Sequence, residues 1–168
     1  MCIRDSQNGP VHYPYPVIRM AEMYLNLAEI LIELDALENT TGRLEEAKGL
    51  IDKIRVRAGI PTIDEAWKKA NHPEKANTAE GLREIVRRER QIEFYLENQR
   101  FWDLRRWKDA GILGEKVWGM NIEGDTDETF FVPTELQNIR TFKQAQYLMP
   151  IPMTETNKVP HIVQNPGY

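Results

Sequence analysis

The stretch from Val17 to Glu38 reads VIRMAEMYLNLAEILIELDALE and decides the fold of this chain. It contains neither proline nor glycine, and its apolar residues recur at steps of three and four, which predicts a long helix. These residues are Ile18, Ala21, Tyr24, Leu25, Ala28, Leu31 and Ile32. Met20, Leu27 and Leu34 widen the apolar stripe, so we expect this helix to be buried on more than one side.

A second helix is predicted over residues 44–58, after a short turn at residues 39–42. Its apolar residues repeat in strict steps of three and four, a narrow row suited to one partner helix. They are Leu44, Ala47, Ile51, Ile54 and Ala58. Gly59 and Pro61 follow in the order typical of a helix C-terminus. Two such helices form an antiparallel hairpin, the unit from which tetratricopeptide-like solenoids are stacked.

The chain continues through a long connection, with one helical turn expected near residues 66–68. A third helix is predicted from about residue 77 to residue 97, with Asn77 and Glu80 as its N-terminal capping pair. A shorter fourth helix is expected over residues 101–110, because a glycine follows it directly.

Glycine and proline punctuate the rest of the chain, and no βαβ alternation occurs. The apolar runs Phe130–Val132 and Tyr147–Met149 fit strands or extended segments. A C-terminal segment this apolar needs a protein surface to pack against, and we interpret it as a wrap over the helices. The predicted fold class is therefore all-α: tetratricopeptide-like helical hairpins with a proline-rich irregular C-terminal wrap. Residues 1–14 are expected to be an irregular leader, and residues 15–168 one domain.

Composition narrows the classes of function. The 168 residues include 41% hydrophobic and 29% charged residues, the usage of a globular protein. The net charge of −4 disfavours a uniformly basic nucleic-acid binder, so no nucleic-acid partner is expected. The single cysteine, Cys2, excludes an internal disulfide and a Cys-rich zinc site. The sequence contains no run of 18 apolar residues, so no transmembrane helix is predicted. Met1–Ser6 lacks the apolar core of a signal peptide.

Two carboxylates, Glu89 and Glu93, fall on or beside the apolar face of the third helix when residues are placed at about 100° intervals. A buried carboxylate must be paired, so cations are expected nearby. The candidates are Arg55, Arg57, Arg90, Arg100, Arg105 and Arg106. One interpretation is a glycosidase-like pair of acid and base. The favoured interpretation is a structural Arg–Glu lattice, because arginines lower carboxylate pKa values, the wrong direction for a general acid. The six residues expected in this lattice are Glu89, Glu93, Arg55, Arg57, Arg100 and Arg105.

The sequence gives only weak indications of metal, phosphate or nucleic-acid binding. His12, His72 and His161 lie far apart without metal-ligand spacing, and residues 125–128 lack the further ligands of a calcium loop. No phosphate-binding glycine loop is present. Residues 100–108 mix basic and aromatic side chains as single-strand binders do, but their helical spacing favours core packing. No metal, no cofactor and no catalytic residue are therefore expected.

Five segments, in order, resemble the C-terminal region of the SusD/RagB family, and together they cover roughly residues 15–168. They are Arg19–Leu25, Ile54–Gly59, Arg83–Phe94 followed by Arg100–Lys108, Met149–Pro152, and Gln164–Tyr168. The resemblance implies the C-terminal part of a larger α-helical domain. It also implies that Met1–Ser6 is a spurious leader, because family members are longer and begin with a signal peptide and a lipidated cysteine.

The resemblance further implies a function. Such proteins are surface-exposed lipoproteins of the outer membrane in Bacteroidota-type bacteria, held by a lipid anchor absent from this chain. They capture glycans or peptides and deliver them to a SusC-like TonB-dependent transporter, and for this chain an oligosaccharide or polysaccharide ligand is expected. They are binding proteins and not enzymes.

Two aromatic residues are candidate ligand contacts, because flat apolar rings stack on the C–H faces of sugars. Trp67 and Trp118 lie in loop-like surroundings, but the favoured interpretation for both is core packing or contact with the remainder of a longer protein. Two other functions stay open: a stand-alone tetratricopeptide-like adaptor for proteins, and an enzyme using Glu89 and Glu93. If the chain is part of a longer protein, it should expose an apolar surface where the remainder packs.

Overall fold

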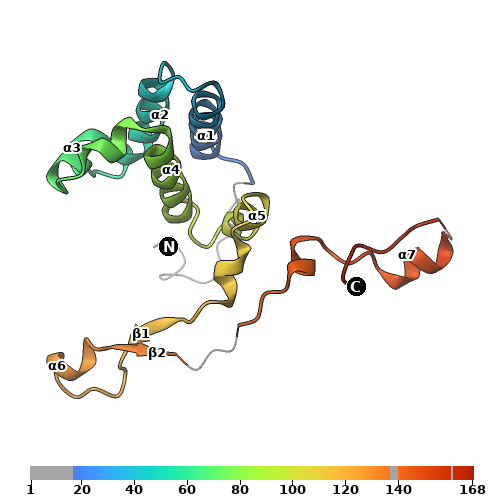
Figure 1. Ribbon diagram of the computed structural model, residues 1–168. Helices are drawn as coiled ribbons and strands as arrows, with labels where there is room; N and C mark the ends of the chain where they lie inside the picture. The colour runs from blue at the N-terminus through green and yellow to red at the C-terminus, as the bar shows by residue number, and fades with distance from the viewer. Residues whose placement is uncertain (1–16, 137–139, 160) are drawn as a thin grey trace, which may run out of the picture. The chain divides into compact units, whose positions relative to one another are not determined.

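The computed structural model describes residues 17–136, 140–159 and 161–168 (Figure 1). The predicted leader, with Cys2 and His12, lies outside the described residues. The chain divides into two compact units, the first ending at Tyr95 and the second beginning at Leu96.

The first unit opens with the predicted hairpin, formed by α1 (Met20–Glu38) and α2 (Leu44–Arg57). Figure 1 shows the two helices side by side. Asp35 organises the turn between them: its carboxylate accepts hydrogen bonds from Thr40 Oγ1 at 2.7 Å and from the backbone N–H of Arg43 at 2.7 Å. Asn39 takes a left-handed conformation there (φ 54°), which an asparagine tolerates better than most residues.

Three further elements complete the first unit: α3 (Ile63–Lys69), the 3₁₀ helix η2 (Pro73–Asn77) and α4 (Ala79–Glu93). The expected helical turn at residues 66–68 thus belongs to a two-turn helix. The predicted capping residue of the next helix is wrong by one position. Thr78 caps α4 by accepting a hydrogen bond from the backbone N–H of Gly81 at 3.1 Å, whereas Asn77 donates to the carbonyl of Pro73. The predicted extension of α4 to residue 97 is also wrong, because Leu96 and Asn98 have positive φ angles.

The core of the first unit lies between α1, α2 and α4. The side of α1 that carries Ala21, Leu25, Ala28 and Ile32 is buried there, as the helical spacing predicted. The expected second buried side is not found among the described residues. Met20, Leu27 and Leu34 are exposed instead.

The second unit is a series of short elements. They are α5 (Gln99–Arg106), η3 (Ala110–Gly114), β1 (Trp118–Met120), α6 (Asp127–Phe130), β2 (Pro133–Glu135), η4 (Gln144–Tyr147) and α7 (Met153–Lys158). The helix α5 ends four residues before the predicted position, since Lys108 has a positive φ of 60°. Strands β1 and β2 form an antiparallel pair with Trp118 opposite Glu135. The segment Phe130–Val132, expected as a strand or an extended segment, does not form a strand: Phe130 lies in α6 and β2 begins at Pro133.

The observed class is mainly helical, and the antiparallel helical hairpin confirms the tetratricopeptide-like prediction. The second unit has the irregular, proline-punctuated character that the sequence indicated, with one short β-hairpin added. The wrapping of that unit over the helices stays a prediction.

Candidate functional site

Two Arg–Glu ion pairs join α2 and α4 in the first unit. Arg55 Nη1 pairs with Glu89 Oε1. Arg57 Nη2 lies 2.5 Å from Glu93 Oε2, and Arg19 pairs with the same carboxylate. The structure therefore brings together four of the six residues expected in the lattice, Glu89, Glu93, Arg55 and Arg57, in two ion pairs that connect the same two helices.

The electrostatics of Glu93 bear on the catalytic alternative. Burial raises the pKa of this carboxyl, but hydrogen bonds from Arg57 and Arg19 lower it more, so the pKa lies below its usual value. A carboxyl held ionised in this way has no proton to donate near neutral pH. The arrangement fits a docking contact between helices and disfavours a general acid at Glu93.

The charged network includes Arg83, which was not among the cations expected near Glu89 and Glu93, and Arg90, which was. Arg83 donates to both carboxylate oxygens of Glu33 on α1, at 2.5 and 2.7 Å. Arg90 Nη1 donates to Asn26 Oδ1 at 2.6 Å, and its guanidinium lies 5.3 Å from the ring centre of Phe94. The sequence did hold one sign of these contacts: α1 carries acidic residues and no basic one, so its carboxylates need cations from other helices.

The remaining two predicted lattice residues lie in the second unit. The guanidinium of Arg105 stacks 3.5 Å from the ring centre of Phe101, and its Nη1 donates to the carbonyl of Phe101 at 3.1 Å. Arg100 lies 5.9 Å from the ring centre of Trp107. Within the second unit, both guanidiniums thus contact aromatic rings.

The first candidate ligand contact, Trp67, lies on α3 and packs partly against the core of the first unit. Lys75 Nζ sits 5.0 Å from its ring centre and also pairs with Glu84 at 2.5 Å. A shallow pocket of about 340 Å³ beside the ring is lined by polar residues that include His72 and Thr78. Core contacts and Lys75 therefore occupy much of the ring surface on which a sugar would stack.

The second candidate, Trp118, is presented differently. Its side chain is 61% exposed on β1 of the second unit. Residues directly opposite in an antiparallel pair share a face, so Glu135 lies beside Trp118. Lys116 Nζ pairs with Glu135 Oε2 at 2.7 Å. An open aromatic ring is thus accompanied by an ammonium and a carboxylate, the groups that form hydrogen bonds with sugar hydroxyls.

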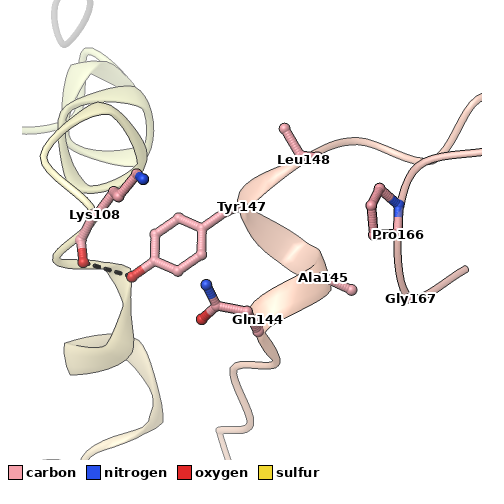
Figure 2. Close-up of a pocket in the computed structure, with 7 residues that line it drawn as sticks. All are labelled: Lys108, Gln144, Ala145, Tyr147, Leu148, Pro166 and Gly167. Atoms are coloured by element: carbon pink, nitrogen blue, oxygen red, sulfur yellow. Dashed lines mark hydrogen bonds between the residues drawn. The ribbon is translucent and has the colours of Figure 1, made fainter.

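A pocket that the sequence reasoning did not find lies in the second unit (Figure 2). It has a volume of about 510 Å³ and is lined by Lys108, Gln144, Ala145, Tyr147, Leu148, Pro166 and Gly167. Figure 2 shows the ring of Tyr147 reaching toward the backbone of Lys108, where the hydroxyl donates to the carbonyl at 2.6 Å. The pocket joins segments far apart in the chain, and helical spacing gives no sign of it.

The part of the chain that the structure describes holds neither a metal-binding cluster nor a membrane-spanning helix. No group of three or more histidine, cysteine, aspartate or glutamate side chains there could hold a metal ion. None of the described helices combines the length and the apolar character needed to cross a lipid bilayer.

Comparison with known proteins identifies the family. The model of the SusD family matches residues 4–168, and the chain belongs to this family. The sequence resemblance of the five segments to SusD/RagB proteins is thereby confirmed.

Individual relatives agree with this assignment. SusD-like protein P2 of Formosa agariphila is 30% identical over 92% of this chain. A solved SusD-like protein from Bacteroides fragilis superimposes with a TM-score of 0.70 at 36% identity, over 93% of this chain. The solved protein BT4246 superimposes with a TM-score of 0.75 at 32% identity, over 94% of this chain. The chain spans about a quarter of the length of these relatives: 26%, 28% and 25%, respectively.

Proposed function

We propose that this chain is the C-terminal part of a cell-surface nutrient-binding lipoprotein, which captures glycans at the outer membrane for a SusC-like TonB-dependent transporter. The match of the SusD family to residues 4–168 carries the proposal. The fold supports it, because the solved SusD-like relative has the same fold over 93% of this chain.

The role is binding rather than catalysis. Glu89 and Glu93, the carboxylates that a hydrolase would use, are each engaged by an arginine. A retaining or inverting glycosidase needs one carboxyl that holds a proton and releases it to the leaving group. The lowered pKa of Glu93 opposes that task.

Within the chain, Trp118 is the better glycan contact of the two candidates. Its ring is mostly exposed, whereas Trp67 packs against the core and under Lys75. Stacking needs an open ring face, and sugar hydroxyls need adjacent charged or polar groups. Lys116 and Glu135 supply such groups beside Trp118.

Affinity electrophoresis of the 168-residue chain through gels that contain plant, algal or bacterial polysaccharides tests this proposal. We expect at least one polysaccharide to slow the chain, and Trp118→Ala to abolish that retardation. Trp102→Ala is the matched control, since Trp102 is also an exposed tryptophan but lies on α5. The proposed contact is wrong if no polysaccharide slows the chain, or if the two variants migrate alike.

A further inference from the structure

The pocket of the second unit presents a cation and an amide to solvent. Its volume of about 510 Å³ falls within the range of roughly 300–1,000 Å³ that is typical of small-ligand sites. Among the described residues that line it, Lys108 is charged and none is acidic. Within the described part of the chain, the Lys108 ammonium forms no ion pair and the Gln144 amide forms no hydrogen bond. Both groups are therefore available to a ligand.

The rest of the pocket lining is mainly apolar and includes one aromatic ring, that of Tyr147. This ring packs edge to face against Phe142, with ring centres 4.9 Å apart, and its hydroxyl donates to the carbonyl of Lys108 at 2.6 Å. Figure 2 shows the amide of Gln144 on the same side of η4 as the ring. One pocket thus combines an aromatic ring, an amide and an ammonium, the groups that contact the ring and the polar substituents of a sugar.

The backbone around the pocket is held in place before any ligand binds. The backbone N–H of Lys108 donates to the carbonyl of Arg105 at 3.1 Å, and the Lys108 carbonyl accepts the bond from Tyr147. Gly167 approaches η4 so closely that a Cβ at this position would lie 2.7 Å from the Cβ of Ala145. A preformed site loses less conformational entropy on binding than a site that must first become ordered.

Charge decides which class of ligand suits the pocket. An apolar occupant, such as an aliphatic segment of protein, would cover the ammonium and the amide without pairing them, which costs free energy. A neutral sugar would contact the ring of Tyr147 and the amide of Gln144 but would leave the ammonium of Lys108 without a counter-charge. An acidic sugar satisfies all three groups, because its carboxylate or sulfate pairs with the ammonium.

We infer that this pocket is a subsite for an acidic sugar unit of a polysaccharide. Lys108 pairs with the carboxylate or sulfate, Gln144 forms hydrogen bonds with hydroxyl groups, and the ring of Tyr147 packs against the sugar ring. The inference rests on the proposed function and names its substrate class, a polysaccharide with acidic units. Lys108 is then the residue that selects for charge, whereas the exposed ring of Trp118 stacks on acidic and neutral sugars alike.

Affinity electrophoresis with paired polysaccharides tests the inference. Polygalacturonate and its highly methyl-esterified form share one backbone and differ in charge, and dextran sulfate and dextran are the matching pair for sulfate. Migration is expressed relative to a gel without polysaccharide, which removes the effect of each variant's own charge. We expect one acidic polymer to slow the 168-residue chain more than its neutral counterpart does. Lys108→Gln should weaken binding to that polymer about tenfold, the effect of one charged hydrogen bond.

Two further variants separate the pocket from general charge and from folding. Lys143→Gln removes the same charge from an exposed lysine of the second unit that does not line the pocket, and it should bind like the unchanged chain. Lys108→Gly removes the ammonium and suits the left-handed backbone at this position (φ 60°). It should therefore keep the fold and bind as weakly as Lys108→Gln.

The inference is overturned if neither acidic polymer slows the chain more than its neutral counterpart, or if Lys108→Gln binds like the unchanged chain. An equal loss in Lys143→Gln would also overturn it, since the attraction would then come from general charge. Trp118→Ala, run beside these variants, separates this inference from the proposed glycan contact. Retardation that depends on Trp118 but not on Lys108 overturns the inference alone, and the reverse pattern overturns the proposed contact alone.

Discussion

Arg55 on α2 and Glu89 on α4 form an ion pair that is almost closed to solvent, with side chains 13% and 11% exposed. The pair joins two helices of the core and lies next to the carboxylate of Glu93, which Arg57 and Arg19 share. Breaking one partner of a buried pair leaves the other charge without compensation, and this cost exceeds the net contribution of the intact pair.

Glu89→Ala is therefore expected to lower the free energy of unfolding by about 3–5 kcal/mol. The cause is the uncompensated guanidinium of Arg55. Urea unfolding followed by circular dichroism measures the change. Glu84→Ala is the control: Glu84 lies on the same helix and pairs with Lys75 at the surface, so its loss should be under about 1 kcal/mol. Equal losses in the two variants would contradict the docking role of Glu89.

Gly81→Ala is expected to prevent α4 from starting in its native position. A Cβ at residue 81 would lie 2.1 Å from the carbonyl oxygen of Lys75, a backbone atom that cannot simply rotate away. Gly49→Ala in α2 is the control, because a Cβ there meets nothing within 4 Å. The control should stabilise the protein by up to about 1 kcal/mol through the better helix propensity of alanine. Thermal melts measure both effects: the melting temperature should fall in Gly81→Ala and rise in Gly49→Ala. A Gly81→Ala protein as stable as the unchanged chain would contradict the close packing.

Acidification is expected to destabilise the first unit. Hydrogen bonding to Arg83 lowers the pKa of Glu33, and the arginines at Glu93 outweigh its burial and lower its pKa. The unfolded chain binds these protons more readily, so the stabilisation is complete above about pH 4.5 and is lost as pH falls through the folded-state pKa values. Burial raises the pKa of Asp52, which offsets part of the loss.

Melting temperatures between pH 3 and pH 7 measure this dependence. Glu93→Gln should flatten the acid limb of the curve, because it removes one of the titrating groups. A melting temperature that rises on acidification would contradict the assignment.

Tyr147→Phe is expected to make the pocket of the second unit more mobile while the aromatic ring still lines it. The change removes the hydrogen bond from the Tyr147 hydroxyl to the carbonyl of Lys108, worth about 1 kcal/mol, and keeps the ring. Hydrogen exchange of the backbone amides at residues 144–148 should become faster. Tyr95→Phe, at an exposed tyrosine of the first unit, should leave that exchange unchanged. Unchanged exchange in Tyr147→Phe would show that the hydroxyl does not hold the segment.

Much of the first unit could be predicted from the sequence, because long apolar periodicity reports helices that bury one side. The hairpin of α1 and α2 follows from this pattern, as do its turn and the approximate start of α4. The exact capping residue did not follow. Asn77 and Thr78 are both good capping types, and only the observed bond from Gly81 to Thr78 separates them.

The second unit was harder to predict, for physical reasons. A three-residue strand such as Trp118–Met120 is too short to show a period, and it contains a glycine. Trp67 is less open to a ligand than Trp118, in part because Lys75 lies over its ring. Lys75 is eight positions from Trp67 in the sequence, and the direction of its side chain cannot be predicted from the spacing of apolar residues. Helix α1 shows a further limit: the sequence correctly indicates two apolar sides, but not which of them is covered.

Arg19 has a consequence for how this family can vary. It directly precedes α1, and its guanidinium donates to the backbone carbonyl of Glu93, the last residue of α4, at 2.6 Å. The chain therefore enters and leaves the three-helix core at neighbouring points. A segment with adjacent ends can be inserted, exchanged or duplicated without forcing its flanking chain to reroute. The loops and appended units around this core can thus change while the core itself stays the same.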